Sequence, residues 1–447
     1  MSPILSNKSA IVIGGGLAGC EAAYQLAKRG VRVTLYEMRY TGRDKLPPKT
    51  TPAHQSGLLA ELVCSNSLKS TELSNAHGLL KAELELLNSL IVKTAKLSAV
   101  PAGKALAVDR IRFAQLVTER IAQHEAVTIR PEEAKEIPET PAVIASGPLT
   151  SETLADRIAR FAGKDNLFFY DAIAPIVSAD SLDYGKMFKG SRYSDDGQYW
   201  NCPLTKDRYR SFVSELAAAQ RHRPHDFEAG HFYEGCLPVE VMAERSRDSL
   251  RFGMMKPIGL FNPHEGRRPY AALQLRQENA SGTMFNLVGF QTQLARNEQK
   301  RVFSMIPGLE RAEYLRFGSM HRNTYLNAPG LLLPTMQSTS RPDLFFAGQL
   351  TGVEGYVESA ASGLIAGINL ARALAGKETK SPPETTMTGQ LCRYVAVSGS
   401  KSYQPMNANL GLLPPLDTPI REKPQRNQAL SKRSLGDLAA WIEDSEI

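Results

Sequence analysis

The sequence predicts an α/β fold in which one parallel sheet is built from two distant parts of the chain, with an α+β insertion between them. A short apolar run at Ser9–Ile13 leads into a glycine-rich turn, a helical stretch and a second apolar run. A strand, a glycine turn and a small-residue helix return at residues 344–375. Residues 171–317 are rich in aromatic and basic side chains and in short β-like runs. At 447 residues, we expect two domains or one domain with a large insertion.

The turn after the first strand has the pattern G-x-G-x-x-G, formed by Gly14, Gly15, Gly16, Leu17, Ala18 and Gly19. In a strand–turn–helix unit, the first glycine makes the tight turn and the second lets a pyrophosphate approach the backbone. The third allows the helix to pack closely on the strand. The helix, expected over residues 17–29, adds free N–H groups and a partial positive charge at its N-terminus. The pattern therefore predicts a dinucleotide site.

An acidic residue closes the second strand of this unit. Residues 31–36 are expected to form the strand, and Glu37 follows it, where a carboxylate can accept hydrogen bonds from a ribose. The alternative is an ordinary βαβ unit with a glycine-rich turn, which does not explain an acid at this position. We therefore interpret the N-terminal region as a Rossmann-like, dinucleotide-binding unit.

The following residues alternate between loops, helices and one further strand. Residues 39–52 are rich in proline, threonine and basic residues and are expected to form a loop. Apolar residues recur at helical spacing over residues 77–95, and a second helix is expected over residues 111–124. A strand is expected at residues 141–144, with a helix beginning near Glu152. In two-part flavin folds, a strand that ends in a small-residue turn passes close to the cofactor.

The second part of the predicted sheet lies near the C-terminus. Residues 344–347 are expected to form a strand, followed by Gly348 and Gln349 and by a small-residue helix at residues 359–375. In two-part flavin domains a glycine at this strand end lies by the ribityl chain and the pyrophosphate. The next residue is usually Asp, but the Gln349 amide can still form hydrogen bonds there. The two parts together favour FAD over NAD.

We therefore expect a Rossmann-like two-part FAD-binding domain with an α+β insertion domain. The first part is expected over residues 1–170, the insertion, with a substrate or RNA role, over residues 171–317, and the second part with a C-terminal tail over residues 318–447. Residues 377–388 are expected to be a linker, and the tail is expected to cover the domain.

Composition excludes several classes of protein. Because no run of about 18 apolar residues is present, we expect no membrane span. The N-terminus lacks a basic segment followed by an apolar core, so we expect no secretion signal. We therefore expect the protein to act in the cytoplasm. The formal charge of +7 fits an anionic macromolecule as partner, and equally a solvated surface without one.

The five cysteines predict a reactive thiol rather than a disulfide framework. Their number is odd and no two have C-x-x-C spacing, which argues against a disulfide framework and against a zinc site. Cys64 lies among serine and asparagine residues, and Cys236 lies between Gly235 and Pro238, with basic residues further along. A thiolate needs such polar or basic neighbours near neutral pH. For each cysteine, a buried structural thiol is the alternative.

Long, specific runs extend over almost the whole chain, at residues 59–67, 234–244, 255–260, 286–291, 320–324, 347–361 and 403–409. Through these runs the chain resembles the folate- and FAD-dependent tRNA (uracil-5-)-methyltransferase family. It departs from the pattern of that family at Lys69, Ser246, Met254 and Leu410, none of which lies at the glycine turn or is one of the cysteines.

The resemblance implies a chemistry that uracil requires. Uracil C5 is a poor nucleophile, and a thiolate that adds to C6 makes it reactive. The one-carbon unit comes from methylenetetrahydrofolate by way of FAD, and NAD(P)H resets the flavin. The implied substrate is the T-loop uridine of tRNA, which becomes m5U54, and that base must be unstacked before a thiol can reach it. We expect no obligate protein partner and no membrane contact.

The same resemblance assigns roles to side chains. Cys236 is expected to add to C6 and Cys64 to lie beside the flavin, as base for the C5 proton or in a transient adduct, although the sequence leaves the two roles exchangeable. His321 is expected to line the active site or to be structural. Contacts with RNA phosphates or folate carboxylates are expected at Arg245, Arg251, Lys256 and Arg276. Each of these four also fits a solvated surface charge.

Three alternatives remain open at this point. The same chemistry can act on a uridine of 23S ribosomal RNA. In a different class, an NAD(P)H-dependent flavin oxidoreductase can use Cys64 and Cys236 as a thiol pair, with no need of folate. The third alternative is a flavin-bound RNA-binding protein without turnover.

Overall fold

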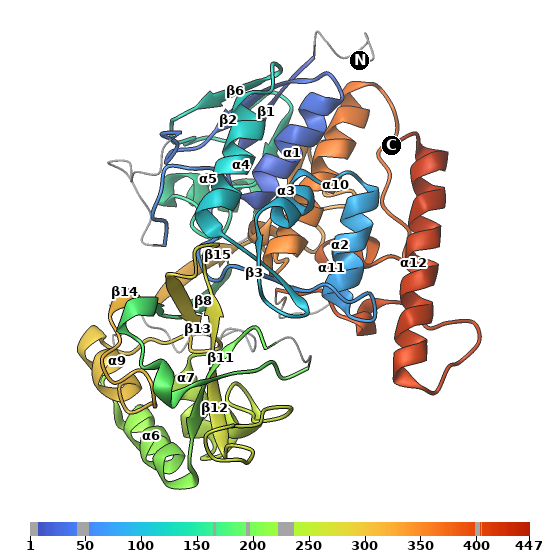
Figure 1. Ribbon diagram of the computed structural model, residues 1–447. Helices are drawn as coiled ribbons and strands as arrows, with labels where there is room; N and C mark the ends of the chain where they lie inside the picture. The colour runs from blue at the N-terminus through green and yellow to red at the C-terminus, as the bar shows by residue number, and fades with distance from the viewer. Residues whose placement is uncertain are drawn as a thin grey trace.

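The computed structural model describes residues 8–42, 53–163, 167–193, 197–221, 237–397, 403 and 405–447, with residues 167–173 and 320–323 described by their backbone alone. Figure 1 shows two bodies. The upper one contains the N-terminal and C-terminal parts of the chain, and the lower one contains its middle. None of the helices in the described ranges is both long and apolar enough to cross a membrane.

The first body is built around a parallel sheet with strand order β16-β7-β1-β2-β6. These strands are β1 (Ser9–Ile13), β2 (Arg32–Tyr36), β6 (Val127–Arg130), β7 (Ala142–Ile144) and β16 (Leu344–Phe346). Ile13 pairs with Tyr36 and Ile144, and Ile144 pairs with Phe346. Four strands therefore end at one edge of the sheet, which confirms the predicted two-part, Rossmann-like arrangement.

Two helices from opposite ends of the sequence pack against each other beside this sheet, as Figure 1 shows. They are α1 (Leu17–Lys28) and α10 (Tyr356–Leu374). A Cβ at Gly363 would lie 2.7 Å from the carbonyl carbon of Ala18, and a Cβ at Gly367 would lie 2.7 Å from the carbonyl oxygen of Ala22. Real Cβ atoms do not approach so closely, so the small residues of α10 allow this helix contact.

The stretch 77–95, expected as one helix, forms two: α2 (Ala76–Leu86) and α3 (Leu90–Leu97). The prediction was wrong because the break comes from local turn chemistry that apolar periodicity does not reveal. Asn88 has a φ of +59°, in the left-handed region that asparagine tolerates. The Ser89 side chain then accepts a hydrogen bond from the Val92 N–H and begins α3.

The other elements of the first body surround this core. The helices are α4 (Arg110–Ala122) and α5 (Glu152–Ala162), and a small sheet has the order β3-β5-β4. Its strands are β3 (Ser67–Ser70), β4 (Ala99–Val100) and β5 (Ala105–Val108).

The expected tail contains two helices, α11 (Met387–Val397) and α12 (Lys423–Ser445), and α12 lies along the outside of the first body in Figure 1. Glu83 of α2 holds both of them. Its carboxylate accepts hydrogen bonds from the N–H groups of Met387 and Thr388, both at 2.8 Å, and from the Ser434 hydroxyl of α12.

The second body has its own sheet, its own helices and a separate hydrophobic core. The sheet is antiparallel, with strand order β10-β11-β12-β13-β9-β14. Its strands are β9 (Ile176–Ser178), β10 (Phe188–Lys189), β11 (Trp200–Leu204), β12 (Ala271–Gln277), β13 (Met284–Leu287) and β14 (Tyr314–Arg316). Its helices are α6 (Lys206–Ala218), α7 (Val239–Arg245), α8 (Ser249–Phe252) and α9 (Arg296–Phe303). The paired strands β8 (Leu167–Ile173) and β15 (Ser319–Tyr325) carry the chain into and out of it.

Candidate functional site

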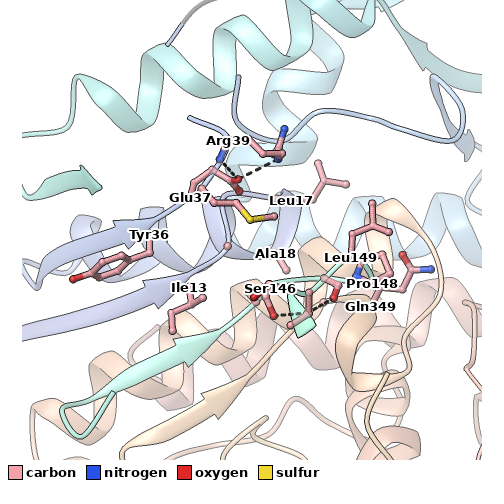
Figure 2. A pocket seen from close by; sticks show the side chains of 18 of the residues that line it. Ile13, Leu17, Ala18, Tyr36, Glu37, Arg39, Ser146, Pro148, Leu149 and Gln349 are labelled. Carbon is pink, nitrogen blue, oxygen red and sulfur yellow. Dashed lines mark hydrogen bonds and ion pairs between the residues drawn. The ribbon is translucent and has the colours of Figure 1, made fainter. Parts of the chain in front are cut away.

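A cleft opens where the parallel strands of the first body end. It is open to solvent, and its empty space, counted together with the solvent in its opening, is about 1010 Å³. Figure 2 shows Glu37 and Arg39 on one side, Ser146, Pro148 and Gln349 on the other, and Leu17 and Ala18 between them. The cleft brings together seven of the predicted cofactor residues: Gly14, Gly16, Leu17, Ala18, Glu37, Gly348 and Gln349.

Gly14 and Gly19 shape the turn behind the cleft. Gly14 has a φ of +101°, and its N–H donates a hydrogen bond to the Tyr36 carbonyl at 2.8 Å. A Cβ there would lie 2.7 Å from the carbonyl carbon of Ala145, at the end of the neighbouring strand β7. A Cβ at Gly19 would overlap the Gly14 carbonyl. Both positions therefore require glycine, as the sequence pattern predicts.

The N-terminus of α1 faces the cleft and suits an anionic ligand. Gly16 is the N-cap residue, and the first turn contains no acidic residue that would pair with the free N–H groups. A Cβ added at Gly16 would have no heavy atom within 4 Å, so the space in front of this backbone is open. The helix end and the open approach together fit the pyrophosphate of a dinucleotide.

Glu37 has a second role that the sequence did not indicate. Its carboxylate accepts hydrogen bonds from the Gly15 N–H at 2.8 Å and from the Arg39 N–H at 3.0 Å. The Arg39 guanidinium lies 3.1 Å away and also 3.6 Å from Glu61. Glu37 thus holds the glycine turn in place, and its expected contact with a ribose stays a prediction.

The C-terminal part of the chain completes the cleft. Gly348 has a φ of +78°, and its N–H donates to the Ser362 hydroxyl at 2.8 Å. A Cβ at Gly348 would lie 2.9 Å from the Ala18 side chain, so glycine is required for close contact with α1. On the turn that follows β7, which also lines the cleft, the hydroxyls of Ser146 and Thr150 lie 2.7 Å apart. Both ends of the chain therefore contribute to the same cavity.

Cys64 lies on a loop beside this cleft, next to Val63 and Tyr356, which line it. The Tyr356 hydroxyl accepts hydrogen bonds from the N–H groups of Cys64 at 2.8 Å and Ser65 at 3.0 Å. Burial raises the pKa of Tyr356 above its usual value, and electrostatic interaction with the nearby Cys64 raises it further. The tyrosine therefore stays neutral and fixes the backbone of the Cys64 loop.

Side chains from the second body hold the other side of this loop. Arg276 of β12 is buried, and it donates from Nε to Asn66 and from a terminal nitrogen to the Ser65 hydroxyl, both at 2.8 Å. Asn66 donates in turn to the Gln277 carbonyl at 2.9 Å. Buried polar contacts at the Cys64 loop thus help to join the two bodies.

Three guanidinium groups interact electrostatically with Cys64: those of Arg110, Arg276 and Arg316. Arg110 donates to Glu278 at 2.7 Å and to the Leu62 carbonyl at 2.9 Å. Reactive cysteines lie in electropositive, partly exposed surroundings, whereas structural cysteines are buried. Cys64 is half-buried, whereas burial raises the pKa values of Cys20 and Cys202 strongly and that of Cys392 to about 12. Among the described cysteines, Cys64 is therefore the one suited to react.

Comparisons with known proteins identify the family of this chain. The profile of the family described as Glucose inhibited division protein A (GIDA) matches residues 9–378. A relative from Pelotomaculum thermopropionicum, named methylenetetrahydrofolate--tRNA-(uracil-5-)-methyltransferase TrmFO, is 54% identical over 98% of this chain and 99% of its own. The TrmFO protein of Halalkalibacterium halodurans is 52% identical over 97% of this chain and 98% of its own. The chain belongs to the TrmFO family.

A solved structure gives the same fold at much lower sequence identity. GidA from Aquifex aeolicus superimposes with a TM-score of 0.67 and 17% identity, covering 98% of this chain and 76% of the GidA chain. This likeness concerns the fold alone, and it agrees with the split sheet and the inserted body described above.

The remaining predicted residues of this TrmFO family member are distributed as follows. Cys236 and the side chain of His321 lie outside the described part of the structure. Arg245 is exposed, and Arg251 and Lys256 are half-buried beside aromatic rings. Arg276, expected at an RNA or folate surface, is instead buried behind Cys64.

Sequence reasoning missed two residues beside Cys64. Tyr356 positions the Cys64 loop, and Arg110 places a positive charge near it. Tyr356 begins α10 and Arg110 begins α4, far from Cys64 in the sequence. The one signal was that Tyr356 falls within residues 347–361, one of the runs that carry the family resemblance.

Proposed function

We propose that this chain transfers a one-carbon unit from methylenetetrahydrofolate to C5 of a uridine in tRNA, as the names of its relatives state for them. The observation that supports this most strongly is the identity of 54% over 98% of the chain. The target that we propose is the T-loop uridine at position 54, and the proposed reductant is NAD(P)H.

FAD is the cofactor that the cleft fits, and when bound it would supply the electrons that turn the transferred carbon into a methyl group. The Gly14 turn, the open backbone at Gly16 and the N-terminus of α1 would hold the pyrophosphate. We propose that Glu37 contacts a ribose and that Gly348 and Gln349 contact the ribityl chain or the phosphates.

The reaction requires two protein groups, a nucleophile and a base. We propose that the Cys236 thiolate forms a bond to C6 of uracil, which makes C5 nucleophilic, and that this bond breaks when the product forms. Cys64, which interacts electrostatically with Arg110, Arg276 and Arg316, would accept the C5 proton. The reverse assignment of the two cysteines remains the second possibility.

We also propose that the chain divides at residues 170/171 and 317/318 and acts in the cytoplasm. In support of this division, one hydrophobic core draws on residues between Ala10 and Leu438 on both sides of the middle region. The other core draws on residues between Val177 and Leu309.

The test is methyl transfer to an unmodified tRNA transcript by the FAD-loaded chain, with methylenetetrahydrofolate and NAD(P)H. Cys236→Ser should lower the rate by at least about a thousandfold, because the C6 bond cannot form, while FAD stays bound. The control Cys392→Ala removes a buried thiol outside the cleft and should retain transfer. A normal rate in Cys236→Ser would contradict its assignment. Transfer to 23S ribosomal RNA alone, or turnover without folate, would favour the alternatives.

A further inference from the structure

The second body has an unusual cluster of exposed aromatic side chains. Among the side chains that the structure describes, the three most exposed aromatic ones are Tyr193, Phe252 and Phe261, which are 61%, 73% and 61% exposed. All three lie in this body, and Ile258, 51% exposed, lies between two of them in sequence. Three large apolar side chains this exposed within residues 252–261 point to a binding surface.

Basic side chains are interleaved with these rings. The Lys256 ammonium lies 5.2 Å from the Tyr193 ring centroid. The Arg251 guanidinium lies 5.2 Å from the Phe252 ring centroid and 4.3 Å from that of Tyr270. We call Tyr193, Phe252, Lys256, Ile258, Phe261 and Arg268 the aromatic–basic face.

Hydrogen bonds give this face a fixed shape. Arg268 donates to the Pro257 carbonyl at 2.9 Å, and Arg192 donates to the Met254 carbonyl at 2.7 Å. The Asn262 N–H donates to the Arg267 carbonyl at 2.9 Å. The rings are therefore carried by a folded backbone, so that little backbone entropy is lost when a partner binds.

The charge of this region identifies the class of partner. Residues 245–268 contain six Lys and Arg against two Asp and Glu, which is an excess of four in a chain whose formal charge is +7. One of the two acids, Glu265, is already paired with Arg267 at 2.9 Å. The cores of protein–protein interfaces are depleted in charge, whereas surfaces that bind unpaired nucleotides combine cations with aromatic platforms.

The position of the face relative to Cys64 is also suitable. The Ala272 N–H, at the start of β12, donates to the Met255 carbonyl at 3.0 Å. Arg276, four residues further along the same strand, bonds to Ser65 and Asn66. Four residues of an extended strand span about 13 Å, so β12 links the backbone beside the face to the Cys64 loop over a length that one folded RNA can cover.

We propose that the aromatic–basic face binds the substrate RNA, with unpaired bases stacked on Phe252 and Phe261 and phosphates near Lys256 and Arg268. This proposal rests on the proposed function and adds to it the surface on which the RNA docks. Bases stack on such rings with little dependence on sequence, so the face supplies affinity and orientation rather than choice of base.

The experiment measures binding of an unmodified, labelled tRNA transcript to the full-length, FAD-loaded chain. Phe252→Ala and Phe261→Ala should each weaken binding about tenfold, with an unchanged salt dependence because no charge is removed. Lys256→Gln should reduce the slope of log Kd against log salt by about one. Leu97→Ala, which removes a 63% exposed side chain from α3 in the first body, should bind like the wild type.

A KM against kcat comparison separates docking from chemistry. The Phe252→Ala/Phe261→Ala double variant should raise KM for tRNA, keep kcat at saturating tRNA, and keep its bound FAD and melting temperature. Wild-type affinity for tRNA in this variant would overturn the proposal. If the variant differed from the wild type only in its sedimentation, the face would bind a second copy of the chain, and the proposal would also be wrong. If the wild type itself fails to methylate tRNA, the proposed function fails instead.

Discussion

At the residue scale, the glycines of the first turn could be predicted from the sequence, and two of them have a backbone requirement that no other residue meets. Gly14 needs a positive φ, and Gly19 needs room for the Gly14 carbonyl. Gly16 is different, since its Cβ position is open and nothing in the protein itself demands glycine there. The open position is the space that a pyrophosphate would occupy.

We predict that Gly16→Val lowers the affinity for FAD by at least about a hundredfold, because the valine side chain fills the approach to the N-terminus of α1. Titration of the FAD-free chain with FAD, followed by absorbance, measures this. Gly436→Val is the matched control, because its Cβ position is also open and it lies on α12, away from the cleft. Full flavin affinity in Gly16→Val would contradict our interpretation of the glycine turn.

A second residue-scale prediction concerns Arg276, which bonds to Ser65 and Asn66 beside Cys64. In a Cys236→Ser background, Arg276→Leu should slow alkylation of Cys64 at pH 7 roughly three- to tenfold, because a positive charge that interacts with the reacting sulfur is lost. Arg276→Lys keeps the positive charge but lacks the planar guanidinium, so its alkylation rate should lie between those of the wild type and Arg276→Leu. Arg245→Leu removes an exposed charge and should have no effect. Equal rates in all variants would remove Arg276 from the account of Cys64.

At the element scale, buried carboxylates join helices that are distant in sequence. Glu21 of α1 accepts hydrogen bonds from the N–H groups of Leu90 and Ile91 and so caps α3, and Glu83 does the same for α11. Glu358 of α10 lies 3.4 Å from His77 of α2 and 3.9 Å from Lys69. These contacts determine where the helices around the cleft lie.

Glu358 gives a pH-dependent prediction. Burial favours its neutral form, but Lys69 and His77 together outweigh burial and hold the pKa of Glu358 at about 2, below its ordinary value of 4.5. A carboxyl whose pKa is lower in the folded than in the unfolded state stabilises the fold at pH values above its unfolded-state pKa. This stabilisation is lost as the pH falls towards the folded-state pKa. Glu358→Gln should therefore lower the free energy of unfolding at pH 7 by up to about 3 kcal/mol.

The difference between wild type and Glu358→Gln should shrink between pH 4.5 and about 2, and urea unfolding at several pH values measures it. Glu72→Gln is the control, because Glu72 pairs with Lys104 at the surface and should contribute little. A difference that does not change with pH would show that charge is not the source of the effect.

At the scale of the whole molecule, the sequence predicted the first body well and the second only as an α+β insertion. The strand–turn–helix units depend on local glycines and apolar runs, which can be recognised in one sequence. The order β10-β11-β12-β13-β9-β14 depends on pairings between distant strands, and nothing local specifies them. The same holds for Tyr356, Arg110 and Arg276, which meet at Cys64 only after folding.

The most direct test of the central claim follows the transferred carbon. The FAD-loaded chain is given methylenetetrahydrofolate with an isotope-labelled methylene group, NAD(P)H and an unmodified tRNA transcript, and the nucleosides are mapped by mass spectrometry. We predict that the label appears in one 5-methyluridine, in the T-loop. A tRNA that stays unlabelled while the protein retains its flavin would contradict the claim.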